Sequence, residues 1–289
     1  MTLTAERQSL RTRALESLGQ LPPFSPILNR LLASLAREDV SFVRIADLIE
    51  KDTVLAGNVL RLVNSALYGR RATVNSVRHA VSLLGINKLR NATLGMSVTR
   101  MWNQVRTPSG WSMGKFNLHS VGTAMLADVL SQAGDVDYAE GAFAAGLFHD
   151  LGRLLIAIGL PEEHDQITRL SSGGFSRYEC EREVLGFTHA ELSGDAMSVW
   201  NLPEEIRTAV TYHHDPELAP ETEAPISLSS LVAAADEFIN AFGYTIETTS
   251  RISSTEHATK RLESLGLNQP LPDLLETFST DFEAMRAMF

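Results

Sequence analysis

Two adjacent residues near the middle of the chain, His149 and Asp150, have the chemistry of metal ligands. They stand in an apolar stretch, residues 142–158, whose pattern predicts a helix. Neighbours on a helix project about 100° apart, so both side chains can border one cavity between helices. Imidazole together with carboxylate is a ligand set typical of divalent Mn, Fe, Ni or Zn. For this pair alone, a structural role in capping and hydrogen-bonding a buried turn is the competing hypothesis.

Two further candidate ligands lie in other apolar stretches. His119 is followed by Val121 and Met125, a pattern that predicts a largely buried helix. Asp236 is an acid within an otherwise apolar helical segment. A buried carboxylate needs a cation, a metal or several hydrogen-bond donors. Asp236 could instead pair with an arginine, or lie at the edge of the apolar stripe beside Glu237.

Three more histidines have positions compatible with ligation. Thr188 and Glu191 match a capping box, which places His189 in the first turn of a helix. The alternative is an exposed residue at the helix start. His213 and His214 end another predicted helix, where a histidine also serves as a partner of the helix dipole.

These candidates share one half of the chain, which starts after residue 110 and holds seven of the eight histidines. They come from separate predicted helices: His119, His149, Asp150, His189, His213 or His214, and Asp236. Helix bundles build metal sites from inward side chains on facing helices. The spacing of these residues therefore suggests a site for one or two divalent ions, whereas their convergence in space is a matter for the structure.

The elements that must position these side chains are helices, because no alternation typical of strands persists. The expected helices span residues 26–36, 42–49, 52–68, 77–84, 88–102, 116–133, 137–158, 178–185, 189–200, 203–213 and 226–242. Two weaker helices follow near Pro270 and Pro272. Asp52 is the expected N-cap of the third helix and Gly69 its stop. The sequence predicts an all-α protein.

Composition sets limits on function. The chain has 289 residues, with 35 acidic against 25 basic residues and a net charge of -10. This balance disfavours broad nucleic-acid or anionic-membrane binding. A patch of Arg70, Arg71, Arg78, Lys88 and Arg90 keeps a nucleic-acid-binding regulator as the last-ranked hypothesis. The single cysteine, the absence of a signal peptide and the shortness of the apolar runs predict a cytoplasmic protein without membrane segments.

The candidate ligands match the signature of a known superfamily. His119, the His149–Asp150 pair and Asp236 resemble the His, His-Asp and Asp signature of the HD metal-dependent phosphohydrolases. A closer resemblance, over about residues 18–242, is to the HDOD family, the HD-related output domain of bacterial signalling proteins. The motifs that carry it are LPP at 21–23, IEKD at 49–52, LRLVNSALYG at 60–69, VRHAVSLLG at 77–85, LRN at 89–91, GLFHDLGR at 146–153, GFTH at 186–189, WNLP at 200–203 and the histidine pair at 213–214.

The resemblance implies a division of the chain. A lead-in helix (1–17) precedes an N-terminal helical subdomain (18–108), which packs on an HD-like helical subdomain (109–245) and is followed by a helical tail (246–289). Because residues 1–17 leave no room for a receiver domain, we expect a stand-alone version. The function implied is a bacterial signal-transduction regulator that binds a protein partner or a nucleotide, with a divalent metal as a compatible component.

The alternative is an active metal-dependent phosphohydrolase. One metal would be held by His119, His149, Asp150 and Asp236, and a second by His189 with His213 or His214. Metal-bound hydroxide would attack phosphorus, with Asp150 as a catalytic ligand and Arg153 steadying the phosphate.

Two departures bear on this alternative. Arg153 stands where the related hydrolases carry lysine. The segment His213-His214-Asp215-Pro216 is not followed by the Gly-Tyr-Pro signature of cyclic di-GMP phosphodiesterases, so that activity is not expected.

Overall fold

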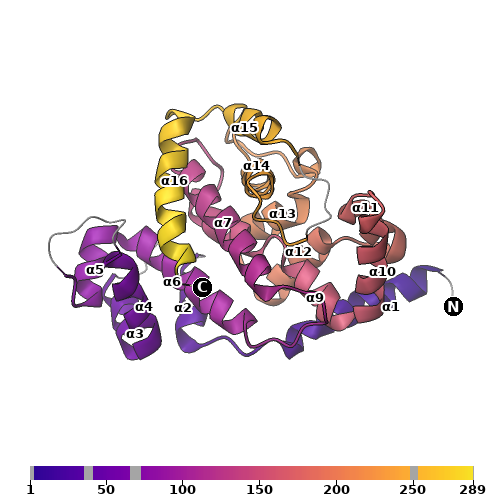
Figure 1. Cartoon of the computed structure of the whole chain (residues 1–289), viewed down its shortest axis with the longest axis horizontal. Helices are drawn as coiled ribbons and strands as arrows, with labels where there is room; N and C mark the ends of the chain where they lie inside the picture. The colour runs from indigo at the N-terminus through magenta and orange to yellow at the C-terminus, as the bar shows by residue number, and fades with distance from the viewer. Residues whose placement is uncertain (1–2, 36–41, 66–72, 248–252, 289) are drawn as a thin grey trace.

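The computed structural model describes residues 3–35, 42–65, 73–247 and 253–288, and this part of the chain folds into helices (Figure 1). It contains no strand, and an isolated parallel bridge joins Val136 to Ile226. The prediction of an all-α protein is confirmed.

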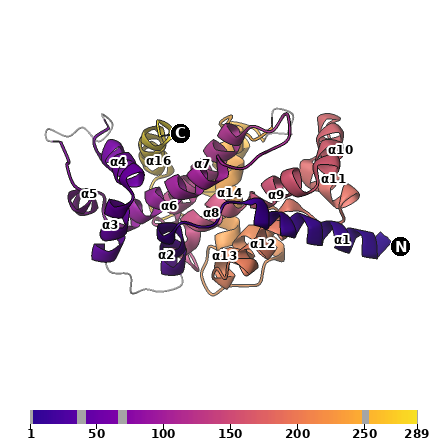
Figure 2. The same cartoon turned by 90° about the horizontal axis from the view of Figure 1, so that it is seen from below.

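The N-terminal helices form two groups in space. Their bounds are α1 (Leu3–Glu16), α2 (Pro26–Leu35), α3 (Phe42–Lys51), α4 (Thr53–Val63), α5 (Val77–Leu84) and α6 (Ile86–Trp102). Helices α2 to α5 gather at one end of the molecule, and α2, α3, α4 and α5 each contact α6 (Figure 1). Helix α1 instead lies along α9 and α12, where Arg11 Nε donates to Asp195 Oδ2 at 2.7 Å (Figure 2).

The helix predicted over 52–68 is shorter in the structure. Asp52 is its N-cap as expected, accepting hydrogen bonds from the amides of Val54 and Leu55. Helix α4 ends at Val63. The side chain of the next residue, Asn64, accepts a hydrogen bond from the backbone N–H of Val74 and donates one to its C=O, which fixes the chain beyond the helix end. The predicted stop, Gly69, lies outside the described residues.

The second half is a helical bundle in which every residue of the short helix α8 is buried. Its helices are α7 (Met113–Ser131), α8 (Ala142–Phe148), α9 (Leu151–Gly159), α10 (Pro161–Ser172), α11 (Arg177–Val184), α12 (His189–Val199), α13 (Glu204–Tyr212), α14 (Leu228–Ala241), α15 (Thr255–Glu263) and α16 (Leu271–Arg286). Helix α7 packs against α8, α14 and α16 (Figure 1). The predicted tail helices correspond to α15 and α16.

The prediction of one continuous helix over 137–158 is wrong, because the structure has two helices there. The break lies at His149 and Asp150, which end α8 and cap the start of α9. The Ser193 hydroxyl on α12 holds the break, since it donates to the His149 carbonyl and accepts from the Gly152 amide, both at 2.8 Å. The apolar pattern runs through both helices, so periodicity alone does not reveal a break made by a contact 41 residues away.

Close helix packing around this break requires glycine. A Cβ on Gly152 would lie 2.0 Å from the His189 carbonyl oxygen, and one on Gly146 would lie 2.7 Å from the Ala124 Cα on α7. Both glycines therefore let neighbouring backbones approach more closely than any side chain permits. The approach brings the ends of α8 and α12 and the middle of α7 towards one point.

One stretch of the described chain, Ala139–Gly159, is apolar and long enough to cross a membrane by length and composition alone. In the structure, nearly all of this stretch is buried inside the protein. Core helices of soluble proteins can be equally long and apolar, and the burial of this stretch is compatible with a soluble protein.

Candidate metal centre

The structure brings the predicted ligand residues together from five helical elements. They are His119 on α7, His149 and Asp150 at the α8–α9 break, His189 at the start of α12, His213 and His214 at the end of α13, and Asp236 on α14. The imidazoles of His119, His149 and His213 are fully enclosed, whereas His214 is exposed. The structure thus places the candidate ligands close together, which spacing alone did not establish, and metal binding by these residues stays a prediction.

One group of side chains surrounds His119. Its Nε2 lies 3.1 Å from His149 Nε2, 3.1 Å from Asp236 Oδ1 and 3.4 Å from Asp150 Oδ2. His149 Nε2 lies 3.5 Å from the same Asp236 oxygen. Two imidazoles and two carboxylates thus aim their ligand atoms at one small volume.

A second group lies on the other side of Asp150. His189 Nε2 is 3.0 Å from Asp150 Oδ1 and 2.9 Å from His214 Nε2. His213 Nε2 is 4.0 Å from the same Asp150 oxygen and is buried without a hydrogen-bond partner among the described residues. Asp150 therefore presents one oxygen to each group, as a carboxylate bridging two ions does.

The other ring nitrogens fix the orientation of the imidazoles. Nδ1 of His119, His149 and His213 donates to the carbonyls of Tyr244, Gly146 and Val210 at 2.9, 2.7 and 2.7 Å. A carbonyl can only accept, so Nδ1 carries the proton and Nε2 of the neutral ring offers its lone pair to the centre. Hydrogen bonds of this kind orient metal-bound histidines in proteins.

His189 is oriented by a carboxylate instead. Its backbone N–H and its Nδ1 both bond Glu181 Oε2, at 2.8 and 2.6 Å. The capping box of Thr188 and Glu191 is present as predicted and starts α12 at this histidine. Glu181 was not among the predicted site residues, because α11 shows it only as one of several acids.

The charges of the centre favour a cation. Burial opposes ionisation of Asp150, but Arg153, His149 and His189 hold the pKa of its carboxyl well below its usual value. Burial also opposes protonation of His119 and His189, yet their carboxylate partners raise both imidazole pKa values to about 9. Two protons thus stand where a divalent ion would supply positive charge, and ion binding would release them.

The donor set fits divalent transition metals. The ligand atoms of three sets lie within 4.8 Å of one another: Asp150, His189, His213 and His214; His119, His149 and Asp150; and His149, His213 and Asp236. Nitrogen and oxygen ligands bind zinc-sized ions at about 2.0–2.2 Å, so ligand atoms on one ion lie up to roughly 4.4 Å apart. The spacing of ligand atoms within each set is therefore close to that on a single ion, and the sets share Asp150, His149 and His213.

Three charged side chains extend the centre, and of these only Arg153 was predicted from the sequence. Arg153, a predicted site residue, is nearly buried and donates from Nη1 to Asp150 Oδ2 at 3.0 Å. Arg177 bonds Glu181 through Nε at 2.9 Å and pairs with Glu247 through Nη1. Glu247 is 70 residues from Arg177 along the chain, so no local pattern predicts their contact.

A cavity of about 370 Å³ opens onto the centre. Its lining includes Arg153, Arg177, His213 and Asp236, together with Arg261 from α15. Such a volume is in the range of small-ligand sites.

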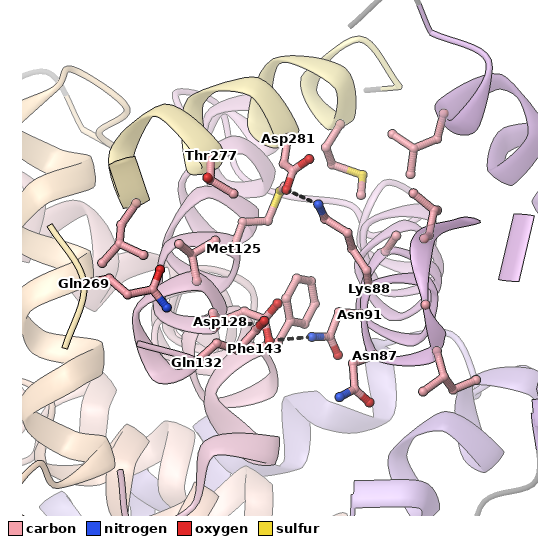
Figure 3. A pocket seen from close by; sticks show the side chains of 18 residues that line it. Asn87, Lys88, Asn91, Met125, Asp128, Gln132, Phe143, Gln269, Thr277 and Asp281 are labelled. Atoms are coloured by element: carbon pink, nitrogen blue, oxygen red, sulfur yellow. Dashed lines mark hydrogen bonds and ion pairs between the residues drawn. The ribbon is translucent and has the colours of Figure 1, made fainter. Parts of the chain in front are cut away.

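A separate cavity of about 460 Å³ lies between α6, α7 and α16 (Figure 3). A Lys88–Asp281 ion pair joins α6 to α16 on one side of this cavity, and a hydrogen bond from Asn91 to Asp128 joins α6 to α7 on another. Among the described residues, its lining includes none of the predicted ligands.

Comparison with known proteins agrees with this architecture. The family model of the HDOD domain matches residues 21–216. An uncharacterised protein of Treponema pallidum (strain Nichols) is 24% identical over 233 residues, which are 76% of this chain and 42% of that protein. The chain thus spans less than half the length of that relative.

Two solved structures share the fold. An HDOD domain protein of unknown function from Geobacter sulfurreducens superposes with a TM-score of 0.75 at 23% identity, covering 98% of this chain and 99% of the other. A protein of Shewanella amazonensis SB2B, provisionally named a phosphohydrolase, gives a TM-score of 0.71 at 23% identity, covering 96% and 97%. Since the family model matches more than half of the chain, the protein belongs to the HDOD family.

Proposed function

We propose that this chain is a bacterial signal-transduction regulator that acts by binding a protein partner or a nucleotide, with one or two divalent ions in the histidine–aspartate centre. The observation that carries the proposal is the state of Arg153. Its Nη1 pairs with Asp150 at 3.0 Å and its Nη2 lies 3.4 Å from Glu247 Oε1. Before a ligand binds, the side chain that would hold a phosphate beside the centre is held by two carboxylates, so it is not free to act on a substrate phosphate without displacing one of them.

The metal has a structural and sensory role in this proposal. His119, His149, Asp150 and Asp236 would hold one ion, and His189 with His213 or His214 would hold a second, sharing Asp150. Bound ions would replace the protons on His119 and His189 and tie α7, α9, α12, α13 and α14 together. An ion between helices of a bundle links their relative positions to its occupancy, which is a property useful in a regulator.

A metal-dependent phosphohydrolase is the second candidate. The feature that favours it is the Nε2 of His213, which is buried, unpartnered among the described residues and aimed at the centre. The metals would supply Lewis acidity and a nucleophile derived from water. Of the chain's own residues, Asp150 would hold the two groups of metal-binding side chains at a fixed separation, and Arg153 would orient a phosphate. The Shewanella neighbour's provisional name agrees with this candidate, but its likeness extends to fold alone.

A turnover assay separates the two candidates. The full chain is supplied with Mn²⁺ or Fe²⁺ and tested on bis(p-nitrophenyl) phosphate and a panel of nucleotides, with Asp150→Asn as the matched control. We expect hydrolysis no faster than in Asp150→Asn, together with calorimetric binding of a nucleotide or of a signalling protein. Turnover near 1 s⁻¹ or above, within the ordinary range of enzymes and lost in Asp150→Asn, would establish the hydrolase instead.

A further inference from the structure

Two arginines beside the centre hold one carboxylate of the chain itself. Glu247 Oε1 pairs with Arg177 Nη1 and lies 3.4 Å from Arg153 Nη2. The three side chains are close to buried, with 6% of Arg177, 11% of Arg153 and 15% of Glu247 exposed. Two guanidinium groups on one oxyanion, enclosed next to a metal-type centre, form an arrangement that recognises phosphate in proteins.

The fit of Glu247 between these arginines is incomplete. Arg153 Nε and Nη2 and Glu247 Oε2 are buried and lack hydrogen-bond partners among the described residues. A carboxylate offers two oxygens in one plane, whereas a phosphate offers oxygens in a tetrahedron. The unsatisfied donors of Arg153 are those that a further oxygen would meet, so the subsite has more donor capacity than Glu247 uses.

Glu247 belongs to a part of the chain distinct from the arginines. Arg153 and Arg177 lie on α9 and α11, within residues 21–216 that match the HDOD family model. Glu247 lies beyond α14 and outside that match. The turn that leads to it, Thr245 and Ile246, is packed into the core, so the carboxylate is delivered by an ordered segment.

We propose that Arg153 and Arg177 form a subsite for the phosphate of a ligand, and that Glu247 occupies this subsite as a tethered internal competitor. The inference rests on the proposed role of the centre as a ligand-binding site and assigns Arg177 as a residue that recognises the ligand. A ligand phosphate displaces the Glu247 carboxylate and takes over its two ion pairs. The ligand class is a phosphate ester, because a tetrahedral oxyanion satisfies the Arg153 donors that a carboxylate leaves unmet.

Ligand binding at the subsite would also change the surroundings of a candidate metal ligand, His189. Arg177 Nε bonds Glu181 Oε1, and the other oxygen of Glu181 holds His189 at 2.6 Å. Arg177 therefore connects the subsite to a candidate ligand of the second ion. Replacement of Glu247 by a phosphate changes the charge that faces Arg177 and, through Glu181, the environment of His189.

The test measures binding of inorganic phosphate to the full chain by titration calorimetry, with acetate as the carboxylate arm. Glu247→Gln keeps the size of the side chain and removes its charge. A competitor that occupies the subsite in nine molecules of ten lowers the apparent affinity about tenfold, so we expect the Kd for phosphate to fall at least about tenfold in Glu247→Gln. The double variant Glu247→Gln/Arg177→Lys should lose this gain, because lysine lacks the guanidinium fork.

The matched control is Glu237→Gln, which removes a carboxylate of similar exposure from the cavity that Arg153 and Arg177 also line, where it pairs with Arg261 at 2.7 Å. An unchanged Kd in Glu247→Gln, or an equal gain in Glu237→Gln, would overturn the proposal. An equal gain for acetate would overturn the assignment to phosphate.

Metal content is measured on the same samples to keep the two proposals apart. A gain in phosphate affinity without bound metal supports the subsite and removes the metal from the proposed function. Bound metal without a gain in phosphate affinity supports the metal centre of the proposed function and overturns the phosphate subsite.

Discussion

Replacement of Ser193 by alanine tests how the break between α8 and α9 is held. The hydroxyl is fully buried and is the only group among the described residues that bonds both the His149 carbonyl and the Gly152 amide. Removing it leaves a buried acceptor and a buried donor without their partner. Each such group costs about 1–3 kcal/mol, so Ser193→Ala should lower the free energy of unfolding by about 2–6 kcal/mol.

Ser120→Ala is the matched control for this change. Ser120 on α7 is also fully buried, but its hydroxyl has no hydrogen-bond partner among the described residues. The same chemical substitution should therefore change the unfolding free energy by less than about 1 kcal/mol, or stabilise the protein.

The assay is urea unfolding of both variants, with metal affinity measured in parallel. The break positions His149 and Asp150, so Ser193→Ala should also weaken metal binding by about 10–100-fold, as losses of groups that orient ligands do. Equal effects of the two substitutions on stability would show that the Ser193 hydroxyl does not hold the break. Unchanged metal affinity in Ser193→Ala would show that the break does not position the metal ligands.

Two further predictions concern pH and packing. Burial and the neighbouring Arg177 lower the pKa of His164 to about 4, so the unfolded chain binds a proton at this residue below pH 6.5 that the folded chain takes up only near pH 4. Stability is therefore lost as the pH falls through this window, by up to roughly 3 kcal/mol, and His164→Asn should flatten that loss in urea unfolding at pH 7 and 5; an identical slope in the variant would contradict it. Gly152→Ala should cost about 1–3 kcal/mol or more because its Cβ would meet the His189 carbonyl, whereas Gly57→Ala, in open space on α4, should stabilise by up to about 1 kcal/mol; similar melting temperatures for the two variants would count against the close approach.

Local signals predicted the elements of the centre well. The capping box at Thr188 placed His189 at a helix start, and the Asp52 N-cap is also as predicted. An acid within an apolar helix identified Asp236. These features depend on residues within four positions of one another, which is the range over which sequence patterns carry structural information.

Contacts between distant segments were beyond such patterns. The apolar run through residues 142–158 concealed the break at Asp150, which Ser193 holds from another helix. No sequence pattern singled out Arg177 or Glu247, because their near-burial results from the packing of α9, α11 and the segment after α14. Sequence spacing likewise indicated which residues could be ligands, while the sharing of Asp150 between two groups is a tertiary result.

Metal uptake by the full chain is the most direct test of whether the histidine–aspartate centre binds divalent ions. The full chain, purified without chelators and dialysed against micromolar Mn²⁺, Fe²⁺ and Zn²⁺, is measured by elemental analysis beside Asp150→Asn and Asp128→Asn. Asp128 is a control acid that hydrogen-bonds Asn91 away from the centre. We expect one or two ions per chain in the wild type and in Asp128→Asn, and loss of the ions in Asp150→Asn. No bound ion in the wild type, or equal content in Asp150→Asn, would contradict it.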